Sequence, residues 1–228
     1  MPPAPLTQAS LAGAALHLAA ADPDLAAILH RRGVPPLWAR EPGFATLVLI
    51  ILEQQVSLAS ARAAFDRLAA AGPVDPASFL GHDDAALLAF GFSRQKARYA
   101  RELSLALVEG RLDLEALAAL DDDAAHARLT TLPGIGPWSA AIYLLMALRR
   151  PDVWPVGDLA LASAVQLAKG LPRLPDADDL VSIAEPWRPW RAVAARLLWS
   201  EYLAPRAARR PSTRSGRDGR GTRGGRAS

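Results

Sequence analysis

Residues 132–138, LPGIGPW, combine residue types that suit contact with an anion. Gly134 and Gly136 allow a tight turn and leave no side chain between their N–H groups and an approaching ligand. Pro137 occupies a position that favours the first turn of a helix. Free N–H groups at a helix start bind anions such as phosphate, so the run predicts a phosphate-binding hairpin or, alternatively, an ordinary turn between two helices.

Asp158 lies twenty residues after Trp138, at the start of a stretch with helical character, residues 159–168. The loop before it, residues 151–157, is stiffened by two prolines. A carboxylate at a helix start accepts backbone N–H bonds, and the helix dipole stabilises its charge. Asp158 is therefore a candidate helix cap and a candidate catalytic carboxylate.

Two adjacent glutamines, Gln54 and Gln55, end an apolar helix that begins at Pro42. Its stripe at helical spacing consists of Phe44, Leu47, Val48, Ile51 and Leu52. Gln55 continues this stripe, where an amide can fill a gap or hydrogen-bond to a base edge. An ordinary exposed helix end would have the same residues, so both interpretations stay open.

Helices must position all of these candidates, because apolar residues recur at helical spacing and no alternating strand pattern occurs. Residues 121–148 have the pattern of a helix, a short hairpin and a second helix. The last helix, residues 189–203, carries Trp199, whose ring belongs either to the core or to the wall of a pocket. We expect an all-α fold.

Composition narrows the class of protein. The chain of 228 residues is 51% hydrophobic, yet it contains no long apolar run free of charges and no leader-like start, which predicts a soluble, non-exported protein without a membrane segment. It has no cysteine, and its four histidines lack ligand spacing, so we expect no disulfide and no dedicated transition-metal site.

Positive charge is concentrated in two places. Residues 204–228 hold eight arginines and one aspartate, which leaves a net charge of −4 for residues 1–203. This Arg/Gly-rich tail is predicted to be disordered and to act as a nucleic-acid tether or only as a solubility aid. A helix after Ser93 begins with cations that either contact phosphate or are simply solvated, namely Arg94, Lys96, Arg98 and Arg101.

Four motifs occur in one order: LEQQVS at 52–57, LPGIGPWSA at 132–140, the Pro/Gly-rich loop to Asp158, and WRPWRAVAARLLW at 187–199. In this combination the chain closely resembles the helix-hairpin-helix Gly/Pro-Asp (HhH-GPD) DNA glycosylases. Within them it is most similar to the 3-methyladenine DNA glycosylase II branch, which includes bacterial AlkA. The resemblance covers residues 35–203 and implies an enzyme that flips a damaged nucleotide out of the DNA duplex.

The resemblance assigns Asp158 as the catalytic aspartate, whose charge stabilises the positive sugar of the transition state. Many members keep a lysine nucleophile where this chain has Trp138, which implies a monofunctional, hydrolytic enzyme that forms no Schiff base. Trp138 and Trp199 match aromatic positions of the base pocket, where ring faces favour cationic purines. Ile142 stands where the branch usually has tyrosine, which implies a roomier pocket.

The resemblance also implies roles in holding DNA. Gln55 matches the residue that fills the gap left by the flipped base, with Gln54 as the alternative wedge. The segment expected to bind phosphate consists of Gly134, Ile135, Gly136 and Pro137. A Na⁺ or K⁺ held by the backbone carbonyls of Leu132 and Ile135 is implied as well, whereas no cofactor, nucleotide cofactors included, is required.

We therefore expect a two-lobed, all-α HhH-GPD glycosylase fold with a DNA-binding cleft between the lobes. One lobe would combine residues 1–53 and 175–203, and the other would comprise residues 54–174, with the helix-hairpin-helix at 121–148. AlkA carries an N-terminal β domain for which this chain shows no matching segment. Any pocket wall that this domain supplies would then be missing or be replaced by the helices before Pro35.

The expected function is that of a DNA-3-methyladenine glycosylase II, which hydrolyses the N-glycosylic bond of alkylated purines and so starts base excision repair. The partner would be double-stranded DNA, bound by a monomer in a cytoplasmic, nucleoid-associated setting. A glycosylase of the same superfamily for deaminated or oxidised bases is one alternative. A non-catalytic module that binds damaged DNA is another.

Overall fold

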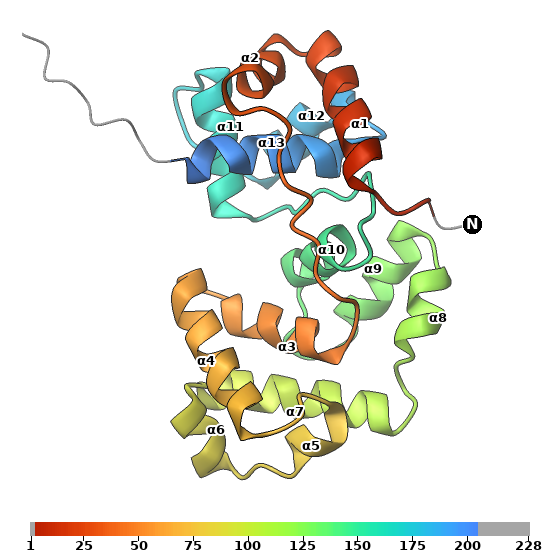
Figure 1. Ribbon diagram of the computed structural model, residues 1–228, viewed down its shortest axis with the longest axis vertical. Coiled ribbons are helices and arrows are strands. Elements are labelled where there is room, and N and C mark those ends of the chain that lie inside the picture. The colour runs from red at the N-terminus through yellow and green to blue at the C-terminus, as the bar shows by residue number, and fades with distance from the viewer. Residues whose placement is uncertain (1–2, 205–228) are drawn as a thin grey trace, which may run out of the picture.

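A computed structural model describes residues 3–204, which form α-helices and one 3-10 helix and no strand within that range (Figure 1). The helices are α1 (Gln8–Ala21), α2 (Pro23–Arg32), α3 (Phe44–Glu53), α4 (Leu58–Ala71), α5 (Pro76–Leu80), α6 (Asp84–Phe90), α7 (Arg94–Val108), α8 (Leu114–Ala119), α9 (Asp122–Thr130), α10 (Pro137–Met146), α11 (Leu159–Lys169), α12 (Ala177–Ala184), η1 (Glu185–Trp187) and α13 (Arg191–Leu203).

The expectation of an all-α fold is confirmed for this part of the chain. None of its helices has both the length and the apolar character needed to cross a membrane. The tail predicted to be disordered lies, from residue 205 onward, outside the described residues.

Two groups of helices divide the molecule (Figure 1). The upper lobe consists of α1, α2, α11, α12 and α13, and α13 packs against both α2 and α11. The lower lobe consists of α3 to α10, where α3 packs against α4, α7 and α10. The chain crosses between the lobes in residues 33–43 and returns in residues 147–158.

The predicted lobe boundaries are wrong at two helices. Helix α3 was assigned to the lobe of the chain ends, but it lies in the lower lobe because seven of its ten residues are buried and α4, α7 and α10 surround it. Helix α11 was assigned to the hairpin lobe, but its contacts are with α2 and α13 of the upper lobe. Asp158, which precedes α11, therefore lies at the junction of the two lobes.

The upper lobe is held together by Asp22, which caps α2 by accepting bonds from the backbone N–H groups of Asp24 (3.0 Å) and Leu25 (3.2 Å). Its other oxygen accepts from Lys169 of α11 (2.7 Å) and from the Trp187 indole N–H (2.8 Å). Burial raises the pKa of the Asp22 carboxyl, but these hydrogen bonds outweigh it, so that the net shift is downward.

Arg196 joins the lobes, and its side chain is fully buried without a carboxylate partner in the described residues. Its guanidinium donates to three backbone carbonyls: Leu37 before α3 (2.9 Å), Ala192 in α13 (3.0 Å) and Leu145 at the end of α10 (2.8 Å). Burial lowers the pKa of Arg196 to about 10, so the group stays charged at neutral pH. Carbonyls at a helix C-terminus carry partial negative charge and suit this cation.

Candidate active site

The hairpin predicted from LPGIGPW joins α9 and α10. Gly134 has φ +85, and a Cβ there would lie 2.1 Å from the Tyr99 ring of α7, so only glycine fits. Gly136 is the N-cap of α10 and provides no side-chain cap, and a Cβ added to it would meet no heavy atom within 4 Å. The N–H of Ile135, by contrast, is already bonded to Leu132 O (3.1 Å), which leaves the glycine N–H groups as the ones open to an anion.

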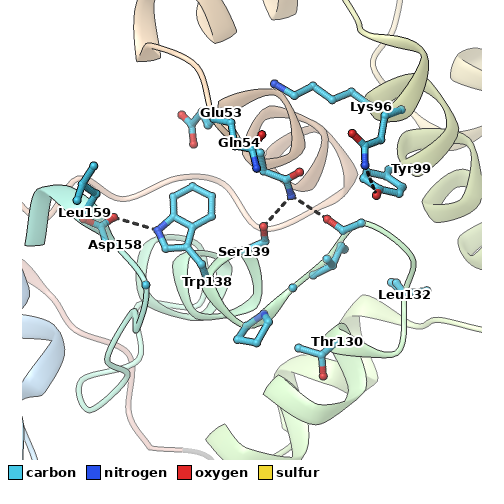
Figure 2. A pocket seen from close by; sticks show the side chains of 17 residues that line it. Glu53, Gln54, Lys96, Tyr99, Thr130, Leu132, Trp138, Ser139, Asp158 and Leu159 are labelled. Atoms are coloured by element: carbon cyan, nitrogen blue, oxygen red, sulfur yellow. Dashed lines mark hydrogen bonds between the residues drawn. The ribbon is translucent and has the colours of Figure 1, made fainter. Parts of the chain in front are cut away.

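Gln54 is tied to this hairpin (Figure 2). Its side-chain amide donates to Gly134 O (2.7 Å) and to the Ser139 hydroxyl (2.9 Å). Gln55 is exposed and has φ +57, because the chain reverses there at the end of α3. The two glutamines therefore differ: Gln54 is engaged inside the protein, and Gln55 is free to contact a ligand.

Asp158 caps α11, as expected, and its two oxygens are fixed by three N–H donors. Oδ1 accepts from the Leu161 backbone (2.7 Å) and from the Trp199 indole (3.3 Å), and Oδ2 accepts from the Trp138 indole (2.9 Å; Figure 2). Among the described residues no Lys, Arg or His nitrogen pairs with this carboxylate. A half-buried anion is thus held rigidly without a neutralising cation.

A cavity of about 500 Å³ opens beside Asp158, between the lobes. The residues predicted as the base pocket all line it: Trp138 and Ile142 from α10 and Trp199 from α13. Tyr143, adjacent to Ile142 in sequence, does not compensate for the missing tyrosine, because it is fully buried and its hydroxyl accepts from Gly43 N (3.1 Å) at the start of α3.

A larger groove, of about 880 Å³, lies beside this cavity along the hairpin. Gln54, Gln55, Leu132 and residues 134–138 line it, together with Lys96 and Tyr99 of α7 (Figure 2). Trp138, Asp158 and Glu53 line both the groove and the cavity, which therefore adjoin at these residues. The sequence analysis assigned no role to Glu53, Tyr99 or Ser139, which also line the groove. The position of Tyr99 three residues after Lys96, on the same face of one helix, is the signal that could have indicated it.

The four cations at the start of α7 have different surroundings. Lys96 donates to Leu52 O (2.6 Å) at the end of α3, and burial lowers the pKa of its amine. Arg94, Arg98 and Arg101 line a separate hollow, where Arg101 pairs with Asp84 (2.9 Å). Only Lys96 therefore borders the groove, and the cluster does not act as one phosphate-binding surface there.

The hairpin carbonyls predicted to hold a monovalent cation present only neutral oxygen donors. Leu132 O accepts one bond, from Ile135 N (3.1 Å), and the described residues supply no hydrogen bond to Ile135 O. Free carbonyl oxygens are ligands that suit Na⁺ or K⁺, so this donor set fits such an ion. No cluster of His, Cys, Asp or Glu suited to another metal occurs in residues 3–204.

These features, a hairpin between two helices, an aspartate cap and an aromatic cavity, define a helix-hairpin-helix protein with a cavity beside a fixed carboxylate. The model of the HhH-GPD superfamily of base excision DNA repair proteins matches residues 48–189, and the chain belongs to that family.

Two curated relatives illustrate the similarity. The chain is 30% identical over 105 residues to a DNA-3-methyladenine glycosylase of Bacillus subtilis, with 46% of this chain and 35% of that protein covered. It is 35% identical over 200 residues to a probable bifunctional transcriptional activator/DNA repair enzyme AlkA of Mycobacterium tuberculosis, with coverages of 81% and 38%. The chain thus spans less than two fifths of the length of either relative.

A solved structure matches over more of its length. The 3-methyladenine DNA glycosylase Mag1 of Schizosaccharomyces pombe, in complex with abasic DNA, superposes with a TM-score of 0.76 at 26% identity. The match covers 82% of this chain and 95% of that one. The two-lobed, all-α fold of residues 3–204 is therefore that of an HhH-GPD glycosylase.

Proposed function

We propose that this chain is a monofunctional DNA-3-methyladenine glycosylase, which hydrolyses the N-glycosylic bond of alkylated purines in double-stranded DNA. The observation that carries the proposal is the placement of Asp158: a carboxylate with no cation partner in residues 3–204, fixed by three N–H donors, where an open groove meets an aromatic cavity. The related glycosylases of Bacillus subtilis and Schizosaccharomyces pombe support the substrate class.

In the proposed reaction the bond from base to C1′ breaks, and its electron pair leaves with the base. An alkylated purine carries positive charge, so it departs as a neutral molecule and needs no strong protein acid. The sugar becomes oxocarbenium-like, and the Asp158 carboxylate stabilises that charge because the donors hold it in place before the reaction. Water then adds to C1′, and its proton passes to Asp158 or to solvent.

Trp138 supports the hydrolytic route over the lysine-dependent one. An amine at this position would attack C1′ and form a Schiff base, whereas the Trp138 indole N–H instead donates to Asp158 at 2.9 Å. The rings of Trp138 and Trp199 form pocket walls that favour electron-poor, cationic purines. Ile142 offers a smaller side chain than tyrosine and leaves a wider pocket.

DNA binding falls to the hairpin and to Gln55. The N–H groups of Gly134 and Gly136, at the start of α10, suit a phosphate, and Ile135 and Pro137 shape the same turn. If Na⁺ or K⁺ is bound, the carbonyls of Leu132 and Ile135 would hold it, and its charge would attract the same phosphate. Gln55, exposed at the groove, is the wedge we favour over the engaged Gln54. The enzyme would act as a monomer, without a cofactor, on chromosomal DNA.

The test uses methylated duplex DNA and measures free base by chromatography, with wild type beside Asp158→Asn. We expect wild type to release 3-methyladenine and the variant to release almost none. Tight binding of damaged DNA without release by wild type would point to a non-catalytic module, and release of only deaminated or oxidised bases would point to another specificity.

Borohydride reduction during the reaction tests the monofunctional claim separately. We expect no covalent protein–DNA adduct, because no lysine occupies the position of Trp138. A trapped adduct would contradict the hydrolytic mechanism.

A further inference from the structure

Trp38 also lines the cavity beside Asp158. It belongs to residues 33–43, the loop that passes from the upper lobe to α3, and its side chain is half-buried. One part of the ring packs against the hydrophobic core, and the rest borders the cavity. The cavity therefore has tryptophans from three separate segments: Trp38, Trp138 and Trp199.

The backbone of Trp38 is strained. Its φ is +47, in the left-handed region that residues with a Cβ seldom adopt. Bulky residues remain in such a conformation only where their surroundings hold them there, and such positions cluster at functional sites. The strain thus indicates that the placement of this ring is enforced by other contacts.

Those contacts lie on both sides of Trp38. Before it, the Leu37 carbonyl accepts from the buried Arg196 guanidinium at 2.9 Å. After it, Arg40 N donates to Met146 O at 3.0 Å, and the Arg40 side chain makes a two-bond ion pair with Glu53 at 2.8 and 2.9 Å. Because the Glu53 side chain is only 8% exposed, this ion pair is well shielded. The loop is therefore fixed to α13, α10 and α3 at once.

We propose that Trp38 is the third aromatic wall of the base pocket and stacks on a flipped, positively charged purine. The proposal takes its ligand from the proposed glycosylase function. Tryptophan has the ring face that attracts cations most strongly, and a flat base stacks on it. Trp38 thus supplies aromatic surface that Ile142 does not. This surface comes from the inter-lobe loop, whereas the sequence analysis considered only the helices before Pro35 as a replacement wall.

Single-turnover release of 3-methyladenine tests this role in Trp38→Ala and Trp38→Phe. Stacking of a base on an aromatic ring implies a loss of about 5- to 100-fold for Trp38→Ala. Trp38→Phe keeps a ring and should recover most of the rate. Trp190→Ala is the matched control, because Trp190 is also half-buried but does not line the cavity, and its rate should stay close to wild type.

Indole N–H signals of ¹⁵N-tryptophan-labelled protein provide a readout that does not require catalysis. The probe is 7-methylguanosine at mildly acidic pH, where its ring is cationic, and each signal is assigned by its loss in a Trp→Phe variant. We expect the Trp38, Trp138 and Trp199 signals to shift and the Trp190 signal to stay in place.

The outcomes separate the two proposals. If the Trp38 indole N–H signal shifts but the wild type releases no base from methylated DNA, the proposed hydrolytic function is wrong and the role of Trp38 as third wall is still supported. Three results would each overturn the role of Trp38 as third wall. The indole N–H signals of Trp138 and Trp199 could shift without that of Trp38, no tryptophan signal could shift, or Trp38→Ala could release base at the wild-type rate.

Discussion

Asp22 in the upper lobe and Asp158 between the lobes have the same local structure. Each is the N-cap of a helix, and each accepts indole N–H bonds: Asp22 from Trp187 at 2.8 Å, and Asp158 from Trp138 at 2.9 Å and Trp199 at 3.3 Å. Asp22 directly follows α1 and precedes Pro23, whereas Asp158 follows the proline-containing loop 151–157, and at both positions the sequence predicts little beyond a helix start. Their local patterns alone do not distinguish a structural from a catalytic carboxylate.

The difference lies in what surrounds each carboxylate. Asp22 is buried and paired with Lys169 at 2.7 Å, and none of the cavities that border Asp158 reaches it. Asp158 borders the 500 Å³ cavity and has no cation partner in residues 3–204. The charge of Asp22 is compensated by Lys169, and this pair holds helices together. The charge of Asp158 has no such partner in residues 3–204 and is available to a cation that arrives from outside.

Replacing Asp22 with alanine should give the largest loss of stability. The change removes the α2 cap and leaves Lys169 and the Trp187 indole without this partner, so we expect a loss of about 3 kcal/mol in the free energy of unfolding. Urea denaturation measures it. Asp24→Ala is the control, because Asp24 also pairs with Lys169 (2.9 Å) but is 39% exposed, and its loss should stay below about 1 kcal/mol. Equal losses in both variants would contradict the structural role of Asp22.

Removing one indole donor from each aspartate compares the two networks directly. Trp138→Phe should lower the single-turnover rate of base release by about 10- to 100-fold, since a hydrogen bond to a charged group is worth about 1.5–3 kcal/mol. Trp187→Phe should instead lower stability and leave the rate of the folded enzyme nearly unchanged. The contrast fails if Trp187→Phe slows base release as much as Trp138→Phe.

The two glutamines offer a smaller version of the same comparison. Gln54→Ala removes two hydrogen bonds to the hairpin and should cost about 1–2 kcal/mol of stability. Gln55→Ala should leave stability within about 0.5 kcal/mol, because the side chain is exposed, and should weaken binding to lesion-containing DNA. Thermal unfolding and fluorescence anisotropy separate the two effects. A stability loss confined to Gln55→Ala would reverse the assignment.

The smallest effect is the dependence of stability on pH. The folded state lowers the pKa of Asp22 below its usual 3.8, because its hydrogen bonds outweigh burial. Asp22 therefore stabilises the fold above the unfolded pKa, and this contribution disappears as pH falls through the folded pKa. The stability gap between wild type and Asp22→Asn, measured in urea, should narrow from neutral pH to about pH 3. A gap that stays constant would show that the charge of Asp22 does not matter.

The sequence predicted the elements that local chemistry determines. LPGIGPW became the hairpin between α9 and α10, the stripe from Phe44 to Leu52 became the buried α3, and Asp158 became the cap of α11. Each of these depends on neighbours within a few residues, which is why spacing and residue type were sufficient.

Features that depend on distant contacts were not predictable. The helical pattern of α11 does not say which lobe it packs against, and Gln54 and Gln55 differ only because the chain turns at Gln55 with φ +57. Trp38 enters the cavity because Arg196, 158 positions later, holds the carbonyl before it. No local pattern connects these two residues.

The most direct test of the central claim measures base release under single-turnover conditions in Asp158→Asn and Asp22→Asn, each corrected for its folded fraction. Asparagine caps a helix as well as aspartate does, so α11 should stay intact in Asp158→Asn. We expect Asp158→Asn to lose about 10³-fold in rate through lost charge stabilisation and Asp22→Asn to stay within about threefold of wild type. An Asp158→Asn variant that keeps its rate within about tenfold, or equal losses in both variants, would contradict the claim that the unpaired carboxylate performs the chemistry.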